Sequence, residues 1–351
     1  MKIHWATPAS GNERGNSLGY SYSNRQLRKA MHNAGVGESE DAKIALHYGF
    51  AGLYKRIPGK INILFTMFES PHLPEEVNAP LRDADAIIVP SLWCAQIFER
   101  HTTKPIYVCP LGVDLSAFPF KKRDQRRNRP FRWLYVGAPN YRKLTVVPEL
   151  YQALFRRTAN AELYIKMTGA SQEGVPEMLE DSSVEQISEG LWRSENCTVD
   201  NRFIPHESLI RLYHWADGFL FAHCGEGFGL TGLEAMATGL APVITAYSGV
   251  MEYATPESAR LCRYCFGALP TEDARTGETV FQWLGWPNRE DVVNEVTKAM
   301  LESPKEALRR GRLARARAEE FSWQATAQDL CRILSEYDTL DGVGANSNPT
   351  V

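Results

Sequence analysis

The 351-residue sequence lacks an unbroken apolar run of about 18 residues, the length that a membrane-spanning helix requires. It also lacks a strong excess of either charge, with 39 Lys and Arg against 42 Asp and Glu, so the composition indicates no polyanionic partner for the whole molecule. The N-terminal sequence MKIHWATPASG passes from a short strand directly into a polar loop, which is not the pattern of a signal peptide. These absences favour a cytoplasmic globular protein, long enough for two domains.

Metal-binding patterns are sparse as well. The seven cysteines are scattered, and we expect them to be reduced thiols because no secretion signal is present. Cys262 and Cys265 form one C-x-x-C pair, but neither a second pair nor a His pair follows at zinc spacing. Packing cysteines are therefore the interpretation that we favour, and the sequence predicts no metal site and no bound cofactor.

The strongest local pattern is glycine-rich and runs from Gly225 to Ile244, with the sequence GEGFGLTGLEAMATGLAPVI. An apolar run of strand length, 215–223, precedes it. The glycines allow the backbone to turn sharply and to approach a ligand closely. A helix is predicted from about Leu230 to Thr238, with Gly239 as its stop. The N-terminus of this helix would present N–H groups and a positive dipole end to an anion such as a phosphate.

Two carboxylates bracket this predicted anion site. Glu226 lies in the loop, and Glu234 lies one helical turn beyond Leu230, where its side chain leans back toward the helix N-terminus. One carboxylate can then reach a group beside the phosphates, and the other can reach hydroxyls on their far side. A nucleotide sugar suits this arrangement. The segment 227–232 also matches G-x-G-x-x-G, so a dinucleotide site and a purely structural glycine turn remain as alternatives.

The combination of E-x7-E, GFGL within it and LEAMATG-x-P-V-I behind it resembles the retaining glycosyltransferases of the glycosyltransferase-B (GT-B) fold, of the family-four or "group 1" type. The resemblance implies an α/β chain with two Rossmann-like α/β/α domains that face each other across a cleft. It also implies that Glu234 binds the nucleotide ribose and Glu226 the donor sugar. The backbone of Gly227, Phe228, Gly229 and Leu230 would face the diphosphate. The family usually has Pro where this chain has Thr231.

Strand and helix patterns alternate across residues 1–114, which predicts a parallel α/β sheet. A second set of strands begins at FRWLYVGAP, residues 131–139, whereas 170–200 is polar and acidic and predicts helix and loop. The expected organisation is an acceptor-side domain, a basic linker, a nucleotide-sugar-binding domain, a helix that returns to the first domain and a disordered tail: 1–118, 119–130, 131–322, 323–340 and 341–351.

The basic run KKRDQRRNR, residues 121–129, falls in the predicted linker. A solvated loop between domains explains it, and so does an electrostatic contact with an anionic acceptor such as nucleic acid or an anionic lipid surface. No aromatic residues are interleaved with the charges, so base stacking has no support here.

Further site residues follow from the resemblance. The family's first loop brings glycines to the diphosphate, and Gly19 is the best match, with Gly15 second. The family's Arg near the start of the second domain is replaced by Ala138, whereas Lys143 matches its second cation. We hypothesise that Arg142 supplies the lost charge, because two phosphates in one site require compensating cations.

Three more positions are candidates. Backbone near Ile204 could contact the edge of the nucleotide base. Glu69 ends the buried run INILFTMFES, residues 61–70, where it could hold a hydroxyl of the acceptor or donor, or cap the turn before Pro71. His72 follows as a weaker candidate at the place where family members often carry a His or an acid.

The sequence therefore predicts a retaining hexosyltransferase that moves a sugar from a UDP- or GDP-linked donor to an acceptor hydroxyl, with Glu226, Lys143 and Glu69 as catalytic candidates. The acceptor could be a saccharide, a lipid-linked glycan or a small alcohol, and a hydroxymethylated base in DNA stays open. A nucleotide-sugar-binding protein without turnover and a nucleotide-sugar epimerase are the alternatives. The oligomeric state is not predicted.

Overall fold

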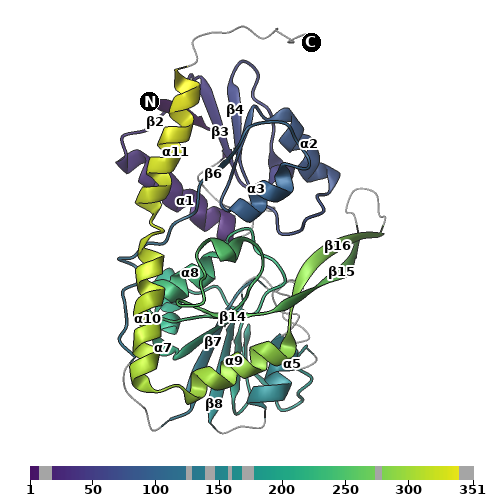
Figure 1. Cartoon of the computed structure of the whole chain (residues 1–351), viewed down its shortest axis with the longest axis vertical. Helices are drawn as coiled ribbons and strands as arrows, with labels where there is room; N and C mark the ends of the chain where they lie inside the picture. The colour runs from purple at the N-terminus through teal and green to yellow at the C-terminus, as the bar shows by residue number, and fades with distance from the viewer. Residues whose placement is uncertain are drawn as a thin grey trace. The chain divides into compact units, whose positions relative to one another are not determined.

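The computed structural model of the chain describes residues 1–7, 18–123, 129–138, 147–156, 160–167, 178–272 and 279–339. The chain divides into two compact units, which are described in turn (Figure 1). The first comprises Met1–Phe68, Leu73–Gly112 and the C-terminal segment from Trp323, and the second comprises Glu69–His72 and Val113–Ser322. None of the described helices combines the length and the apolarity that a membrane span needs.

The first unit contains a six-stranded sheet in the order β2-β1-β3-β4-β5-β6, and all of its neighbouring strands are parallel. Its central strands are buried along their whole length, as expected for a parallel sheet that is covered on both faces. The strands are β1 (Lys2–Trp5), β2 (Gly37–Glu38), β3 (Ile44–Tyr48), β4 (Ile61–Phe65), β5 (Ala86–Val89) and β6 (Ile106–Val108).

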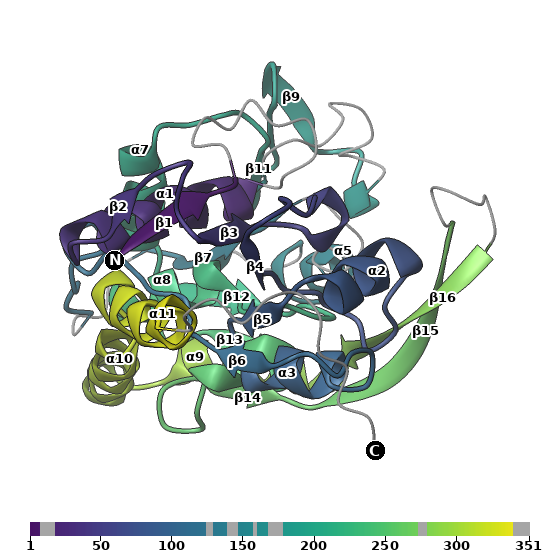
Figure 2. The ribbon, with the colours of Figure 1, turned by 90° about the horizontal axis from the view of Figure 1, so that it is seen from above.

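Helices cover both faces of this sheet (Figure 2). The first helix, α1 (Leu18–Asn33), packs against the last, α11 (Trp323–Asp338). On the other face, α2 (Glu75–Asp83) and α3 (Leu92–Phe98) enclose an apolar cluster with side chains from β4 and β5. A short 3₁₀ turn, Ala51–Leu53, lies beside α2. The α3 N-terminus is capped by Ser91, whose Oγ accepts from the Cys94 N–H at 3.3 Å.

The second unit contains an eight-stranded sheet in the order β14-β13-β12-β7-β8-β11-β10-β9. Strands from β14 to β11 are parallel, and β10 and β9 add an antiparallel extension. The prediction of helix and loop over 170–200 was wrong for the described part of that range, which contains three strands. The strands are β7 (Phe131–Val136), β8 (Ala161–Lys166), β9 (Glu185–Ser188), β10 (Leu191–Arg193), β11 (Cys197–Asp200), β12 (Gly218–Phe221), β13 (Val243–Thr245) and β14 (Arg260–Cys262).

Helices also cover both faces of the second sheet. On one face, α5 (Val147–Leu150), the π-helical turn Tyr151–Phe155 and α9 (Arg289–Leu301) close over a core of buried side chains from β7, β8, β12 and β13. On the other face, α7 (His206–Trp215) packs on β7 and α8 (Leu230–Ala237) packs on β12. Helix α10 (Pro304–Glu319) packs closely on α8, since a Cβ at Gly311 would lie 2.6 Å from the Gly239 carbonyl oxygen.

One further element of the second unit is a long antiparallel hairpin, formed by β15 (Tyr264–Glu272) and β16 (Thr279–Pro287). It extends beyond the edge of the main sheet (Figure 1). The sequence patterns had not indicated this hairpin. All seven cysteines lie in described residues and are free thiols, of which only Cys265, on β15, is exposed.

Candidate functional site

The topology of the second sheet identifies where a ligand should bind. From β7 the chain proceeds outward through β8 and β11, and it then returns to place β12 on the other side of β7. The strand order therefore reverses between β7 and β12. In open parallel sheets, ligands bind outside the carboxyl ends of the strands at such a reversal. The residues that follow Val136 and Phe221 are thus the candidate site, and the loop after Phe221 is the glycine-rich segment singled out by the sequence.

This glycine-rich loop leads directly into α8, as predicted. Gly229 is the N-cap residue and adopts a left-handed conformation with φ of +84°, which favours glycine. As a glycine, it supplies no side-chain acceptor for the first N–H groups of the helix. The carbonyl of Gly229 accepts a hydrogen bond from the Tyr253 hydroxyl at 2.6 Å, which holds the loop in place. The helix N-terminus therefore faces the carboxyl edge of the sheet with its positive dipole end.

The loop is held in place by close backbone approach. A Cβ at Gly249 would lie 1.9 Å from the carbonyl oxygen of Gly227, and a Cβ at Gly225 would lie 2.5 Å from that of Glu69. Contacts this short leave no space for a side chain at either glycine. The glycine-rich loop is thus packed between the turn that follows β13 and the segment Glu69–His72.

Glu226 is buried within this loop, with 6% of its surface exposed. Its backbone N–H donates to the Ser248 Oγ at 2.9 Å, and its carbonyl accepts from the Gly249 N–H at 2.8 Å. Ser248 itself has φ of +70°, an uncommon conformation for a residue with a side chain. The strained turn Ser248–Glu252 therefore determines where Glu226 lies.

Glu234, the fifth residue of α8, is also buried, with 5% of its surface exposed. Its Oε2 accepts from the Tyr213 hydroxyl of α7 at 2.8 Å. Burial raises the pKa of Glu234 to about 7, and the hydrogen bond from Tyr213 opposes this shift. A carboxyl with this pKa can both accept and donate hydrogen bonds near neutral pH, which suits the recognition of hydroxyl groups.

A buried ionic cluster lies at the carboxyl ends of β8 and β11. Lys166 donates to the carbonyls of Met167 (2.7 Å), Asp200 (3.1 Å) and Arg202. The Asp200 carboxylate accepts from the Arg202 guanidinium at 2.9 and 3.0 Å and from the Tyr164 hydroxyl at 2.7 Å.

This cluster has consequences for charge and for the loop that follows. Burial lowers the pKa of Lys166. Burial would raise the pKa of Asp200, but its hydrogen bonds from Arg202 and Tyr164 bring that pKa below the ordinary value. Arg202 anchors the loop that carries half-buried Ile204 into α7. Sequence reasoning missed this cluster, although a Lys and an Asp at the ends of two apolar strands were visible signals.

The remaining predicted residues are dispersed. Glu69 is half-buried and His72 is exposed, and both belong to the second unit although β4 precedes them. Gly19 lies exposed in the first turn of α1, in the first unit. Arg142 and Lys143, as well as Gly15, lie outside the described residues, whereas Ala138 is the last described residue after β7.

The basic run 121–129 is partly engaged with the protein itself. The Arg123 guanidinium donates to backbone carbonyls at the C-terminal ends of α7 and α8, at 2.6 to 3.0 Å. Lys121 also donates to a carbonyl of α7, and Arg129 forms a two-fold ion pair with Asp217 at 2.6 and 2.9 Å. The contacts of Lys121 and Arg123 place cations at helix C-termini, where the dipole favours them, and the charge of Arg129 is paired with that of Asp217.

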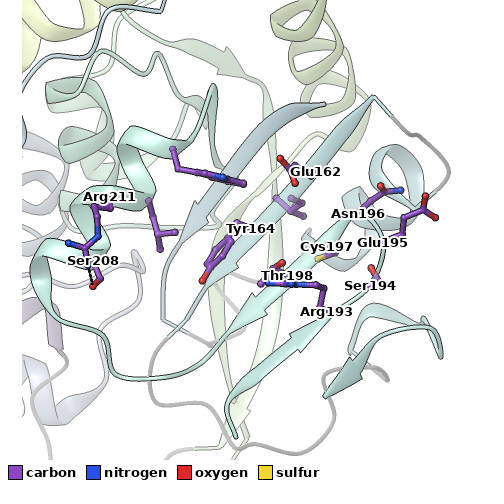
Figure 3. Close-up of a pocket in the computed structure, with 13 residues that line it drawn as sticks. Glu162, Tyr164, Arg193, Ser194, Glu195, Asn196, Cys197, Thr198, Ser208 and Arg211 are labelled. Carbon is purple, nitrogen blue, oxygen red and sulfur yellow. Dashed lines mark hydrogen bonds between the residues drawn. The ribbon is translucent and has the colours of Figure 1, made fainter. Parts of the chain in front are cut away.

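A cavity of about 590 Å³ lies elsewhere in the second unit, between α7 and strands β8, β10 and β11 (Figure 3). Figure 3 shows Ser208 and Arg211 on the helix, across from Tyr164 and Thr198 on the sheet. The cavity also includes Trp215, at the C-terminus of α7, and so reaches the edge where the parallel strands begin. It is therefore separate from the site at their carboxyl ends. In the described parts of the chain, no group of three or more His, Cys, Asp or Glu could hold a metal ion.

Comparisons with known proteins relate part of the chain to a described family. Residues 167–266, which include the glycine-rich loop and α8, match the family described as "Glycosyl transferases group 1". The chain is 26% identical over 299 residues to "MMP alpha-(1->4)-mannosyltransferase" of Mycolicibacterium hassiacum, covering 82% of this chain and 57% of that protein. It is 27% identical over 248 residues to "D-inositol 3-phosphate glycosyltransferase" of Corynebacterium jeikeium, covering 67% and 52%. The chain thus spans about half the length of these curated relatives.

Solved structures show the same fold at low sequence identity. Sucrose-phosphate synthase from Thermosynechococcus elongatus superposes with a TM-score of 0.69 at 16% identity, covering 96% of this chain and 99% of that one. WaaG, described as a glycosyltransferase involved in lipopolysaccharide biosynthesis, gives a TM-score of 0.62 at 13% identity, covering 95% and 100%. Both are GT-B glycosyltransferases. With its parallel α/β units, the chain has the GT-B fold, and its residues 167–266, which include the glycine-rich loop, match the glycosyl transferases group 1 family.

Proposed function

We propose that the chain is a retaining glycosyltransferase that moves a hexose from a UDP- or GDP-linked donor to an acceptor hydroxyl. One observation carries the proposal: two buried carboxylates, Glu226 and Glu234, flank a tightly packed glycine loop at the strand-order reversal of a parallel sheet. The three features match the three parts of a nucleotide sugar. Glu226 would bind the sugar, the glycine loop the diphosphate and Glu234 the ribose.

Each part of the donor is assigned to a feature of the site. The backbone of Gly227–Leu230 and the α8 dipole receive the diphosphate. Glu234 accepts hydrogen bonds from the ribose hydroxyls, and Glu226 orients the sugar. The loop at Ile204, fixed by the ionic cluster of Asp200, borders the base.

Cations and the acceptor complete the proposal. Lys143 and Arg142 neutralise the diphosphate, and Gly19 brings backbone from the first unit. The acceptor side is assigned to residues 1–118, and Glu69, which follows β4 but belongs to the second unit, holds a hydroxyl. Residues 131–322 form the donor side.

The chemistry follows from the leaving group. A nucleoside diphosphate already leaves readily at neutral pH, so the protein mainly neutralises its developing charge and positions the acceptor. The helix dipole and the loop N–H groups act where the glycosidic oxygen gains charge. A phosphate oxygen of the leaving group takes the acceptor proton, and the new bond forms on the face that the diphosphate leaves. Retention then needs no covalent enzyme intermediate and no second carboxylate across the anomeric carbon.

The acceptor class is a hydroxyl of a saccharide, a lipid-linked glycan or a polyol. Relatives named as acting in mannosyl and inositol phosphate glycosyl transfer support that class. We do not extend the proposal to hydroxymethylated DNA, because Lys121, Arg123 and Arg129 of the basic run already bind backbone carbonyls and Asp217.

The test is a screen of UDP- and GDP-sugars for hydrolysis and for transfer to candidate acceptors, followed by mass spectrometry and by NMR of the product anomer. Glu226→Ala should lower transfer about 100-fold or more, with nucleotide affinity and thermal unfolding close to wild type. Glu195→Ala is the matched control, since Glu195 is an exposed carboxylate of the separate cavity.

Three outcomes would count against the proposal. Transfer that survives Glu226→Ala would remove the assigned role of that residue. An inverted product anomer would exclude retention. A wild-type protein that binds nucleotides but turns over no donor would favour the non-catalytic binding protein.

A further inference from the structure

One face of the β15–β16 hairpin carries a row of aromatic rings. The antiparallel register pairs Phe266 with Gly285, Ala268 with Trp283 and Pro270 with Phe281. Because side chains alternate between the faces of a strand, and paired residues share a face, four rings lie on one side of the hairpin. We call this the aromatic face, and it consists of Tyr264, Phe266, Phe281 and Trp283.

All four rings of the aromatic face are exposed, whereas the opposite face contains both the exposed Cys265 and a buried side chain. Phe266 and Phe281 expose 58% and 57% of their surface, and Trp283 and Tyr264 expose 42% and 37%. On the other face, Leu284 is fully buried. Single exposed apolar side chains are common on protein surfaces, but a contiguous group of four large rings indicates a binding surface.

The base of the hairpin is attached to the candidate site. The Gly285 N–H donates to the Cys224 carbonyl at 3.0 Å, one residue before the glycine-rich loop begins. The Tyr247 ring lies 4.8 Å from the Tyr264 ring and 5.5 Å from the Phe266 ring, centroid to centroid. Tyr247 directly precedes Ser248, which binds the backbone of Glu226. The aromatic face therefore begins beside the residues that hold the proposed sugar-binding carboxylate.

The absence of charged residues limits the chemical class of ligand that the aromatic face can bind. Neither 264–270 nor 281–287 contains a charged residue. The adjacent Arg263 is paired with Asp291 at 2.7 Å. Nucleic acid and anionic lipid surfaces are bound through several cations near their phosphates, and these two strand segments offer none. The ligand that fits this face is neutral.

The rings also indicate what such a ligand should look like. Aromatic faces carry partial negative charge, so they attract the weakly positive C–H groups on the apolar faces of sugar rings. The outer edges of a two-stranded hairpin present backbone N–H and C=O groups that can bind hydroxyls at the rim of each sugar. Rings two residues apart on one strand are spaced by roughly 7 Å, which allows successive units of a chain to be contacted.

We propose that the aromatic face binds a neutral saccharide chain, the part of the acceptor beyond the reacting hydroxyl. This role rests on the proposed function, because the acceptor must reach the donor sugar near Glu226. It assigns recognition of an extended acceptor to the second unit.

The test is affinity electrophoresis of the full chain through gels that contain soluble yeast mannan, dextran or glycogen. Wild type should be retarded in at least one of these gels. The double variant Phe266→Ala/Phe281→Ala should bind that polysaccharide about tenfold more weakly. Leu301→Ala, which truncates an apolar side chain that is 75% exposed at the end of α9, is the control and should behave as wild type. Circular dichroism confirms that the variants are folded.

Several outcomes would overturn the inference. These are no retardation in any gel, equal retardation of the double variant, co-sedimentation of wild type with phosphatidylcholine vesicles, and a dimer in sedimentation that the double variant abolishes. Hydrolysis of nucleotide sugars without acceptor, which the double variant should retain, separates the two proposals. Hydrolysis without polysaccharide binding would overturn only the role of the hairpin, whereas polysaccharide binding without donor turnover would overturn the enzymatic activity and the acceptor role but leave a saccharide-binding face.

Discussion

Replacement of Glu234 by Gln tests the electrostatics of the site most directly. Burial raises the pKa of this carboxyl from 4.5 to about 7, so the folded protein holds the proton more tightly than the unfolded chain. The corresponding stability is fully present below about pH 4.5 and is lost as the pH rises through 7. The difference between the two pKa values corresponds to about 3 kcal/mol, at 1.36 kcal/mol per pH unit.

Glu234→Gln removes the titration and keeps the shape. Its amide oxygen can still accept from the Tyr213 hydroxyl, which is 2.8 Å from Oε2 in the wild type. We therefore expect the variant and the wild type to be similarly stable at pH 4.5. At pH 8 the variant should be more stable by up to about 3 kcal/mol. Urea unfolding across this pH range measures the difference, in which the titration of all other groups cancels. Glu195→Gln, at an exposed carboxyl, is the matched control substitution.

The same residue should report on nucleotide binding. If ribose hydroxyls donate to Glu234, they favour its charged form, and binding of UDP or GDP near pH 7 should release a proton. Calorimetry in buffers with different ionisation heats measures that proton, and Glu234→Gln should release none. A variant whose relative stability is the same at pH 5 and pH 8, or nucleotide binding without proton release from wild type, would refute this account of the site.

Four other substitutions have defined outcomes. Gly249→Ala places a Cβ 1.9 Å from a carbonyl oxygen of the glycine-rich loop and should abolish nucleotide binding in calorimetry, and unchanged affinity would contradict the packing described here. Ser248→Ala removes the hydrogen bond to the Glu226 N–H and should cost about 1 kcal/mol in urea unfolding and lower the rate of transfer. Asp200→Asn leaves the buried Lys166 without a countercharge, removes the ion pair of the exposed Arg202 and should cost about 3 kcal/mol, and a loss under 1 kcal/mol would argue against the cluster. Arg123→Ala uncaps α7 and α8 and should cost about 2 kcal/mol, whereas Arg193→Ala, at an exposed arginine, should cost much less.

The parts of the fold that local sequence determines were predictable. The helix predicted from about Leu230 to Thr238 corresponds to α8, and Gly229 and Gly239 have the positive φ values that only glycine adopts readily. The alternation of strand and helix patterns across residues 1–114 also predicted a parallel α/β sheet, which the structure confirms in the first unit.

Features that depend on distant contacts were not predictable. Tyr213, which binds Glu234, is on another helix, and no pattern connects the two. Ser248 adopts a conformation that favours glycine, and only the fold shows that its hydroxyl positions Glu226. These partners are brought together by strand order, which single residues do not encode locally.

The hairpin was missed for a different reason. Its first strand contains Gly267 and Pro270, which are ordinarily turn signals rather than strand signals. Strand β9 was missed because its sequence EQIS is short and polar, and β10 was missed because three residues, LWR, are too few to show the apolar alternation of a strand.

The exposure of Cys265, when five of the other six thiols are buried and Cys331 is half-buried, makes the chain suited to site-selective chemistry without mutagenesis. A maleimide dye or nitroxide would attach preferentially to β15, on the side of the hairpin opposite its row of rings. Spectra of such a labelled sample would report changes in the surroundings and mobility of the hairpin in real time while donors or polysaccharides are added.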